Sequence, residues 1–117
     1  MGRLTTHVLD VSAGIPAAGL RIELHELPSM TGSPVCSVRT DANGRCEKPL
    51  IEGAAFHQGE YLLTFHVAEY FRARAVTLPD PPFFEEIGVR VGIARPDEHY
   101  HVPLLLSPWS YCVYRGG

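Results

Sequence analysis

Ionisable side chains are concentrated near the C-terminal end of the chain, inside two short apolar runs. Residues 99–117 carry His99, His101, Tyr114 and Arg115 between leucine, valine and proline residues. Such side chains are costly to bury within an apolar run unless they are paired or face a cleft. We therefore expect this segment to contribute to a functional site, because folding alone gives no reason for its composition.

A histidine beside an arginine is well suited to hydrolysis near neutral pH. An imidazole with an unperturbed pKa of ~6.5 can take a proton from water. A guanidinium can hold a carbonyl-rich planar substrate through two parallel hydrogen bonds and stabilise the oxyanion that forms on attack. The candidates are His7 in an alternating run, Arg45 after an Asn-Gly pair, and His101. Alternation gives each side chain a face but does not bring the three segments together.

The spacing of His99 and His101 also permits a metal site. Two histidines at this spacing lie on one face of a strand and can bind zinc or copper. The sequence places no third ligand, and Cys112 is the only nearby candidate. We therefore predict no metal at this segment.

Composition disfavours several classes of partner. The formal net charge is -3 and no run of basic residues is present, which argues against nucleic acid and against an anionic membrane surface. No apolar stretch approaches the ~20 residues of a spanning helix, and the N-terminus lacks the apolar region of a secretory signal. The three cysteines, Cys36, Cys46 and Cys112, lack metal-type spacing, so we predict reduced thiols in a cytoplasmic protein.

Short alternating runs are broken by turn residues about every ten positions, which is typical of an all-β sandwich or barrel. The length of 117 residues predicts one domain that spans residues 1–117. An Asn-Gly pair at 43–44 predicts a tight turn, helical spacing predicts one short helix over 68–75, and prolines bound a predicted loop over 28–34. We expect strands over residues 4–10, 20–25, 35–40, 45–50, 60–67, 87–91, 100–106 and 110–115.

Five stretches of the chain match the pattern of a known family. They are residues 4–10 (Leu-Thr-Thr-His-Val-Leu-Asp), 44–46 (Gly-Arg-Cys), 59–61 (Gly-Glu-Tyr), 99–108 (His-Tyr-His-Val-Pro-Leu-Leu-Leu-Ser-Pro) and 114–116 (Tyr-Arg-Gly). Through these motifs the chain resembles the 5-hydroxyisourate hydrolases, the enzymatic branch of the transthyretin family. The C-terminal Tyr-Arg-Gly motif distinguishes these hydrolases from the hormone carriers of the family.

The resemblance implies a fold, an assembly and a reaction. The implied fold is a transthyretin-like two-sheet β-sandwich with one short helix, and the implied assembly is a homotetramer whose active sites open at subunit faces. The implied reaction is the hydrolysis of 5-hydroxyisourate to 2-oxo-4-hydroxy-4-carboxy-5-ureidoimidazoline in urate degradation. The resemblance implies neither a metal nor an organic cofactor.

The resemblance also assigns roles to residues. His7 and His101 match the two family histidines, and Arg45 matches the family arginine after the Asn-Gly turn. We expect the two histidines to position and deprotonate the attacking water, and Arg45 to bind the substrate carbonyls. Tyr114 and Arg115 match the C-terminal motif, which is expected to contribute to substrate binding. The family tail commonly ends in serine, whereas this chain has Gly117 there, so we expect altered affinity rather than lost activity. Which histidine is the general base is left open.

Two other functions make different demands on the sequence. A non-catalytic transthyretin-like carrier of a small ligand predicts an apolar channel at positions 7, 45, 101 and 114, and His7, Arg45 and His101 argue against it. An adhesion sandwich of the immunoglobulin type predicts a Cys…Trp…Cys framework, which the sequence does not contain.

Overall fold

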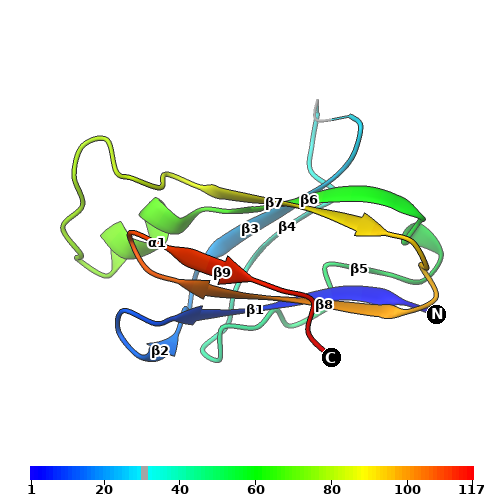
Figure 1. Ribbon diagram of the computed structural model, residues 1–117, viewed down its shortest axis with the longest axis horizontal. Coiled ribbons are helices and arrows are strands. Elements are labelled where there is room, and N and C mark those ends of the chain that lie inside the picture. Colours follow the sequence, from blue (N-terminus) through cyan, green and yellow to red (C-terminus); the bar gives the residue numbers. More distant parts are fainter. Residues whose placement is uncertain (30–31) are drawn as a thin grey trace.

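Two β-sheets pack face to face in the computed structural model, which describes residues 1–29 and 32–117 (Figure 1). The first sheet contains β1 (Arg3–Asp10), β2 (Ile15–Pro16), β5 (Ile51–Glu52), β8 (His99–Leu106) and β9 (Tyr111–Val113). Its order is β2-β1-β8-β9, with β5 also paired to β1. The second sheet contains β3 (Arg21–Glu26), β4 (Cys36–Arg39), β6 (Gly59–Phe65) and β7 (Ile87–Ile93), in the order β4-β3-β6-β7. The predicted all-β sandwich is confirmed.

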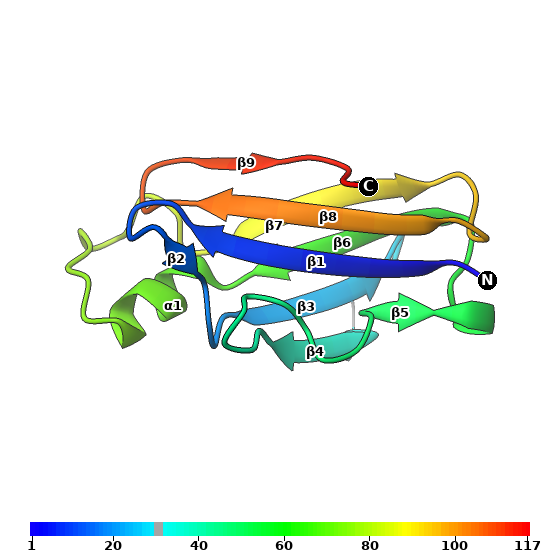
Figure 2. The same ribbon diagram turned by 90° about the horizontal axis from the view of Figure 1, so that it is seen from below.

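The first sheet is built around a parallel pair that joins the two ends of the chain. Strands β1 and β8 run side by side over their full length, with Arg3 opposite His99 and Asp10 opposite Leu106 (Figure 2). Because side chains alternate between the two faces of a strand, this register aligns the inward residues of both strands and, equally, the outward ones. The N-terminal and C-terminal motifs of the sequence therefore share one sheet face.

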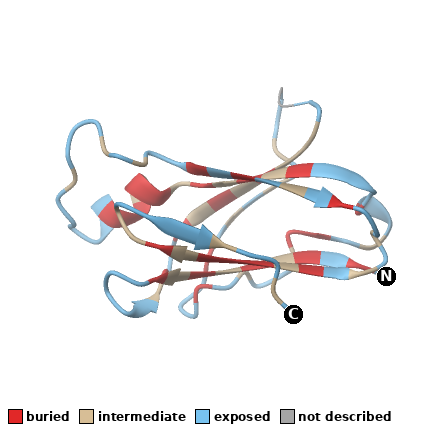
Figure 3. Ribbon diagram, viewed as in Figure 1, coloured by how far each residue is buried: buried red, intermediate tan, exposed pale blue. Residues whose placement is uncertain are grey.

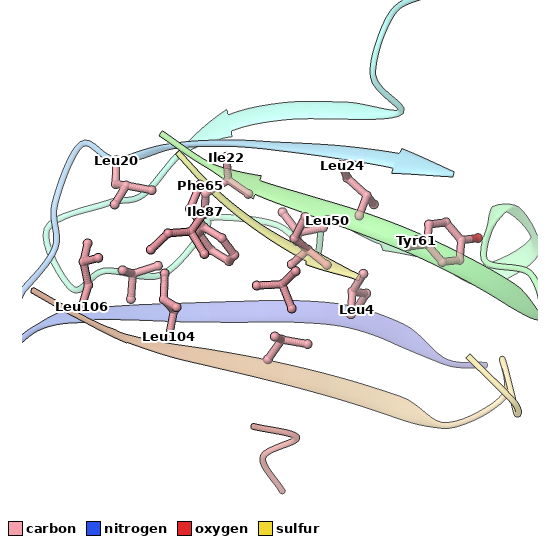
Figure 4. Packing of buried hydrophobic residues seen from close by; sticks show 14 of the residues in the cluster. Leu4, Leu20, Ile22, Leu24, Leu50, Tyr61, Phe65, Ile87, Leu104 and Leu106 are labelled. Carbon is pink, nitrogen blue, oxygen red and sulfur yellow. The ribbon is translucent and has the colours of Figure 1, made fainter. Parts of the chain in front are cut away.

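The core lies between the two sheets. Buried residues alternate with less buried ones along several of their strands (Figure 3). Leu4 and Leu104 from the first sheet project toward Ile22 and Phe65 of the second (Figure 4). Each fully buried aliphatic or aromatic side chain contributes about 1.5–3 kcal/mol relative to an exposed one. The outward positions of β1 are only partly buried, so that face is available for a site.

A short helix, α1 (Val67–Ala73), follows β6, and a 3-10 turn, η1 (Gly53–Ala55), precedes that strand. The helix buries Val67, Ala68, Tyr70 and Phe71 against the sandwich, as its apolar spacing predicts. It ends before the predicted position 75, because Ala75 has a left-handed φ of 62° that a right-handed helix cannot contain.

Most predicted strands are confirmed within a few residues, but the strand predicted over 45–50 is wrong. The backbone N–H of Val8 donates to the Gly44 carbonyl (2.8 Å), and that of Leu50 donates to the Leu4 carbonyl (2.9 Å). Residues 44–50 therefore lie opposite residues 4–8 of β1, a stretch that is two residues shorter. The extra residues bulge away from β1, and regular pairing begins only at Ile51. Pro49, which has no N–H to donate, lies within this bulge.

Part of the predicted loop over 28–34 lies outside the described residues, namely positions 30 and 31. Over residues 1–29 and 32–117, the structure holds no helix with the length and apolar character that crossing a membrane requires.

Candidate active site

The outward face of the β1–β8 pair collects the polar residues of both terminal motifs. Thr5 lies directly opposite His101, and His7 lies opposite Pro103. These outward side chains have intermediate exposure, apart from the buried Pro103. Their inward neighbours on β1 and β8 are buried. The alternation that fills the core thus fixes which side chains can face a ligand.

Arg45 reaches this face because a tight turn precedes it. The Asp41 carboxylate accepts hydrogen bonds from the backbone N–H groups of Asn43 (2.8 Å) and Arg45 (3.2 Å). Gly44 has a φ of +76°, which suits glycine, and a Cβ there would meet the Val8 carbonyl oxygen. The turn ends in an isolated antiparallel bridge between His7 and Arg45. The predicted Asn-Gly turn is therefore what brings the arginine to β1.

The His7 ring is held by the same turn. Its Nε2 lies 2.9 Å from the Asn43 carbonyl oxygen, and because a carbonyl can only accept, Nε2–H is the donor. In the neutral form of the ring, this bond leaves the lone pair on Nδ1. His7 is therefore oriented by the segment that also carries Arg45.

His101 is held by a hydrogen bond and lies in a partly buried place. Its Nδ1 lies 2.8 Å from the Thr5 hydroxyl. Partial burial lowers the pKa of His101, the nearby charge of Arg45 lowers it further, and a proton on His7 would act in the same direction. At neutral pH the ring is therefore uncharged and able to accept a proton.

The C-terminal tail crosses back over this site. The Gly116 N–H donates to the His101 carbonyl (2.7 Å). Arg115 fixes the tail, because its guanidinium donates to Glu98 and to the His99 carbonyl, both at 3.1 Å, and lies 4.0 Å from the Tyr100 ring centre. The tail is thus clamped beside the His101 ring.

Arg45 and His101 line a hollow of about 460 Å³, whereas His7 lies beside it and is not part of its wall. Three cationic residues, Arg3, Arg45 and Lys48, face one acidic residue, Glu47, so the wall favours a small anion or a carbonyl-rich ligand. The bulge after Arg45 forms one wall. The remaining lining residues are Thr5, Thr6, Cys46, Pro49, His99, His101 and Gly117.

The sequence did not single out Arg3, Thr5 or Lys48 as site residues. Arg3 and Thr5 share the His7 face of β1, so strand parity could have identified them. No sequence signal pointed to Lys48, because it lies in the bulge that was predicted to be a strand.

The predicted site residues Tyr114 and Arg115 lie elsewhere within one chain. Strand β9 ends at Val113, so alternation no longer decides where Tyr114 points. Both residues line a second hollow of about 290 Å³ at the edge between the sheets, together with Val91 and Val102. The structure therefore groups His7, Arg45 and His101 and leaves Tyr114 and Arg115 apart from them.

The side chains that could bind a metal ion do not form a cluster in the described part of the chain. Among the described residues, no cluster of three or more His, Cys, Asp or Glu side chains is arranged to hold a metal ion. His99 lines the 460 Å³ hollow as one of its polar walls.

The two-sheet sandwich, with a parallel β1–β8 pair and a short helix after β6, defines a transthyretin-like protein. A family model described as "HIUase/Transthyretin family" matches residues 4–116, and the chain belongs to this family. The curated 5-hydroxyisourate hydrolase of Ralstonia nicotianae is 53% identical over 116 residues, which cover 99% of each chain.

Two solved structures show how widely the fold is shared. A crystal structure of (S)-allantoin synthase superimposes with a TM-score of 0.92 and 46% identity over 99% of this chain, which spans only 44% of that longer chain. Sea bream transthyretin in complex with thyroxine has a TM-score of 0.83 and 29% identity, over 97% of this chain and 94% of that one. The fold alone therefore does not separate catalysis from ligand carriage, and the site residues must decide.

Proposed function

We propose that this protein is a hydrolase that opens the ring of 5-hydroxyisourate, giving 2-oxo-4-hydroxy-4-carboxy-5-ureidoimidazoline in urate degradation. The single observation that carries the proposal is the grouping of His7, Arg45 and a neutral, partly buried His101 on one sheet face. Full-length identity of 53% to a curated 5-hydroxyisourate hydrolase supports the same substrate.

His101 is the general base in this mechanism. Its lowered pKa keeps the ring uncharged at neutral pH, so a lone pair is ready for a proton of the attacking water. His7 donates through Nε2 to the Asn43 carbonyl, which leaves its Nδ1 lone pair to accept a hydrogen bond from the attacking water or from a ring N–H of the substrate. Water adds to a substrate carbonyl, its proton passes to His101, and the ring C–N bond then breaks as that proton is delivered to the leaving nitrogen.

Arg45 has two roles in the mechanism. Its guanidinium binds the carbonyl oxygens of the substrate and stabilises the oxyanion that forms when water adds, which is typically worth 10²–10³ in rate per donor. Its charge also disfavours protonation of His101, so the same residue keeps the base in its active form. No metal or organic cofactor enters these steps.

The tail residues belong to the proposal as substrate-binding groups. Arg115 holds the tail through Glu98 and the His99 carbonyl, and the tail brings Gly117 to the wall of the hollow. Tyr114 is 54% exposed at the sheet edge. Its contact with substrate therefore requires the assembled protein or a movement of the tail.

The proposed assembly is a homotetramer in which each subunit is a single hydrolase domain over residues 1–117. Exposed aromatic side chains support association, because Phe83 (65% exposed) and Trp109 (60% exposed) lie in ring contact beside the edge strand β9. The proposed location is cytoplasmic, which is supported by Cys36, Cys46 and Cys112 being free thiols.

The test is a direct assay of substrate decay. A urate oxidase generates 5-hydroxyisourate in the cuvette, and its ultraviolet absorbance is followed with the wild-type chain, with His101→Asn and with His57→Asn. His57 is exposed and pairs with Glu26 on the other sheet, so it is the matched control. We expect fast decay with wild type and His57→Asn, and a loss of roughly 10²–10⁴ in kcat with His101→Asn.

Two results would overturn the proposal. Folded wild-type protein that fails to accelerate the decay would exclude the hydrolase activity and favour a transthyretin-like carrier. Full activity of His101→Asn would exclude His101 as the base and transfer that role to His7.

A further inference from the structure

Thr5 lies opposite His101, the proposed general base, and forms a hydrogen bond with its ring. The two residues form a register pair of the parallel β1–β8 ladder, and the Thr5 hydroxyl lies 2.8 Å from Nδ1 of His101. The contact is partly buried, which limits competition from water. Among the described residues, no other hydrogen bond is formed by this hydroxyl.

The neighbouring threonine shows what a structural hydroxyl does at the same strand pair. Thr6 points inward, is 3% exposed and donates to the Val102 carbonyl at 2.7 Å. That bond satisfies a buried backbone group and touches no ionisable side chain. Thr5 points outward instead, and its partner is the titratable ring that we propose as the general base.

A hydroxyl can either donate or accept, so the geometry at Nδ1 permits both neutral tautomers of His101. Only one tautomer supports the proposed chemistry. A base that takes a proton at Nε2 must carry its own hydrogen on Nδ1, and the Thr5 oxygen must then accept from Nδ1–H. After the ring has taken a proton at Nε2, the same Nδ1–H bond persists, so Thr5 serves both protonation states without rearranging.

We propose that Thr5 is the positioning residue of this site: its hydroxyl oxygen accepts from Nδ1–H of His101 and so leaves Nε2 as the base. This inference rests on the proposed function, in which His101 removes the proton from water.

The choice of a neutral partner has a consequence for the working pH. A carboxylate at position 5 would also accept from Nδ1–H, but its negative charge would favour the imidazolium. Burial and the charge of Arg45 act in the opposite direction on His101. A hydroxyl therefore orients the ring while the ring stays uncharged and reactive near neutral pH.

The first experiment reads the tautomer without measuring activity. Two-dimensional ¹H–¹⁵N spectra of the histidine rings are recorded for wild type and for Thr5→Val, and the His101 signals are assigned by their loss in His101→Asn. We expect wild type to carry its hydrogen on Nδ1 and Thr5→Val to show a mixture of tautomers. A wild-type ring with its hydrogen on Nε2 would overturn the proposal.

The second experiment measures kcat, KM and the pH dependence of kcat/KM. Thr5→Val, which keeps the side-chain shape, should lower kcat roughly 10-fold with little change in KM, because one neutral hydrogen bond that orients the base is lost. Thr5→Ser should restore most of kcat. Thr5→Asp should move the acidic limb of the pH profile upward, since the added charge raises the pKa of His101.

Thr64→Val is the matched control, because Thr64 occupies a partly buried position on β6, in the other sheet, far from the site residues in the sequence. It should retain wild-type kcat. Unchanged kcat and an unchanged pH profile in Thr5→Val would overturn the positioning role. If wild type shows no hydrolysis at all, the proposed function fails, whereas the ring spectra still report the tautomer that Thr5 selects.

Discussion

Gly116→Ala tests whether the C-terminal tail controls the geometry of His101. A Cβ at Gly116 would lie 3.0 Å from Cδ2 of the His101 ring and 3.3 Å from Cγ of Pro103. Carbon atoms normally rest at about 3.5–4.0 Å, so the ring or the tail must move by at least ~0.5 Å. Gly116 is not among the glycines with positive φ, so its backbone accepts alanine and the contact alone is tested.

The magnitude of the effect follows from which group moves. If the tail lifts, the hydrogen bond from Gly116 N–H to the His101 carbonyl weakens, which costs about 0.5–1.5 kcal/mol. If the ring moves instead, Nε2 shifts against the substrate, and a misplacement of about 1 Å can cost 10²-fold in rate. For a shift of about half that size we expect kcat/KM to fall roughly 10-fold, or about 1.4 kcal/mol.

The assay is the ultraviolet decay of 5-hydroxyisourate, compared with a control that adds the same methyl group elsewhere. Gly88→Ala is that control, because a Cβ at Gly88 meets only Leu62 Cδ1 at an ordinary 3.5 Å and its φ is not positive. We expect Gly88→Ala to keep wild-type activity. A folded Gly116→Ala protein with wild-type kcat/KM would refute the argument that the tail restrains His101.

Three further changes have defined outcomes. Arg45→Gln should lower kcat roughly 10²–10³-fold and move the acidic limb of kcat/KM upward, because removal of the cation raises the pKa of His101 toward its ordinary value. Tyr70→Phe should cost about 1–3 kcal/mol in urea unfolding, because the buried Tyr70 hydroxyl donates to the buried Asp10 carboxylate at 2.9 Å. Gly44→Ala should lower both Tm and activity, since its φ of +76° and its close backbone neighbour leave no room for a methyl group.

Each of these outcomes has a contrary result. An Arg45→Gln protein with an unchanged pH limb would show that this cation does not act on His101. Burial raises the pKa of Tyr70 to about 12, so wild type should lose stability as pH rises from about 10, where the unfolded tyrosine ionises, to about 12. Tyr70→Phe should reduce this alkaline loss but not abolish it, because burial also raises the pKa values of Tyr61 and Cys46. A variant with the full wild-type loss would show that Tyr70 does not contribute to it. A Gly44→Ala protein with normal Tm would show that the turn before Arg45 is not required.

Local pattern predicted much of the fold. Alternation identified β1, β3, β6, β7 and β8, because one face of each strand must enter the core while the other remains outside. The Asn-Gly turn was identified because glycine adopts positive φ at low cost, and its position before Arg45 is confirmed. The helix was predicted from its apolar spacing, although Ala75 in the left-handed region ended it earlier.

The resemblance of the motifs at residues 4–10, 44–46 and 99–108 is enough to predict His7, Arg45 and His101 as partners. Their arrangement within one chain depends on tertiary contacts. Alternation specifies a face but not the neighbouring strand, and β1 and β8 are separated by almost the whole chain. Only the register of that parallel pair places Thr5 against Nδ1 of His101.

Local sequence specifies which residues face inward, where the chain turns and which side chains have the chemistry for hydrolysis. Strand pairing is a property of the whole fold, and pairing sets every distance in the site. Pairing turns the strand expected over 45–50 into a bulge that lines the hollow, because residues 44–50 lie opposite the shorter stretch 4–8 of β1. It also leaves Tyr114 and Arg115 at the sheet edge, since alternation does not extend beyond Val113, the last residue of β9, and pairing resumes only at the isolated bridge between Gly116 and His101.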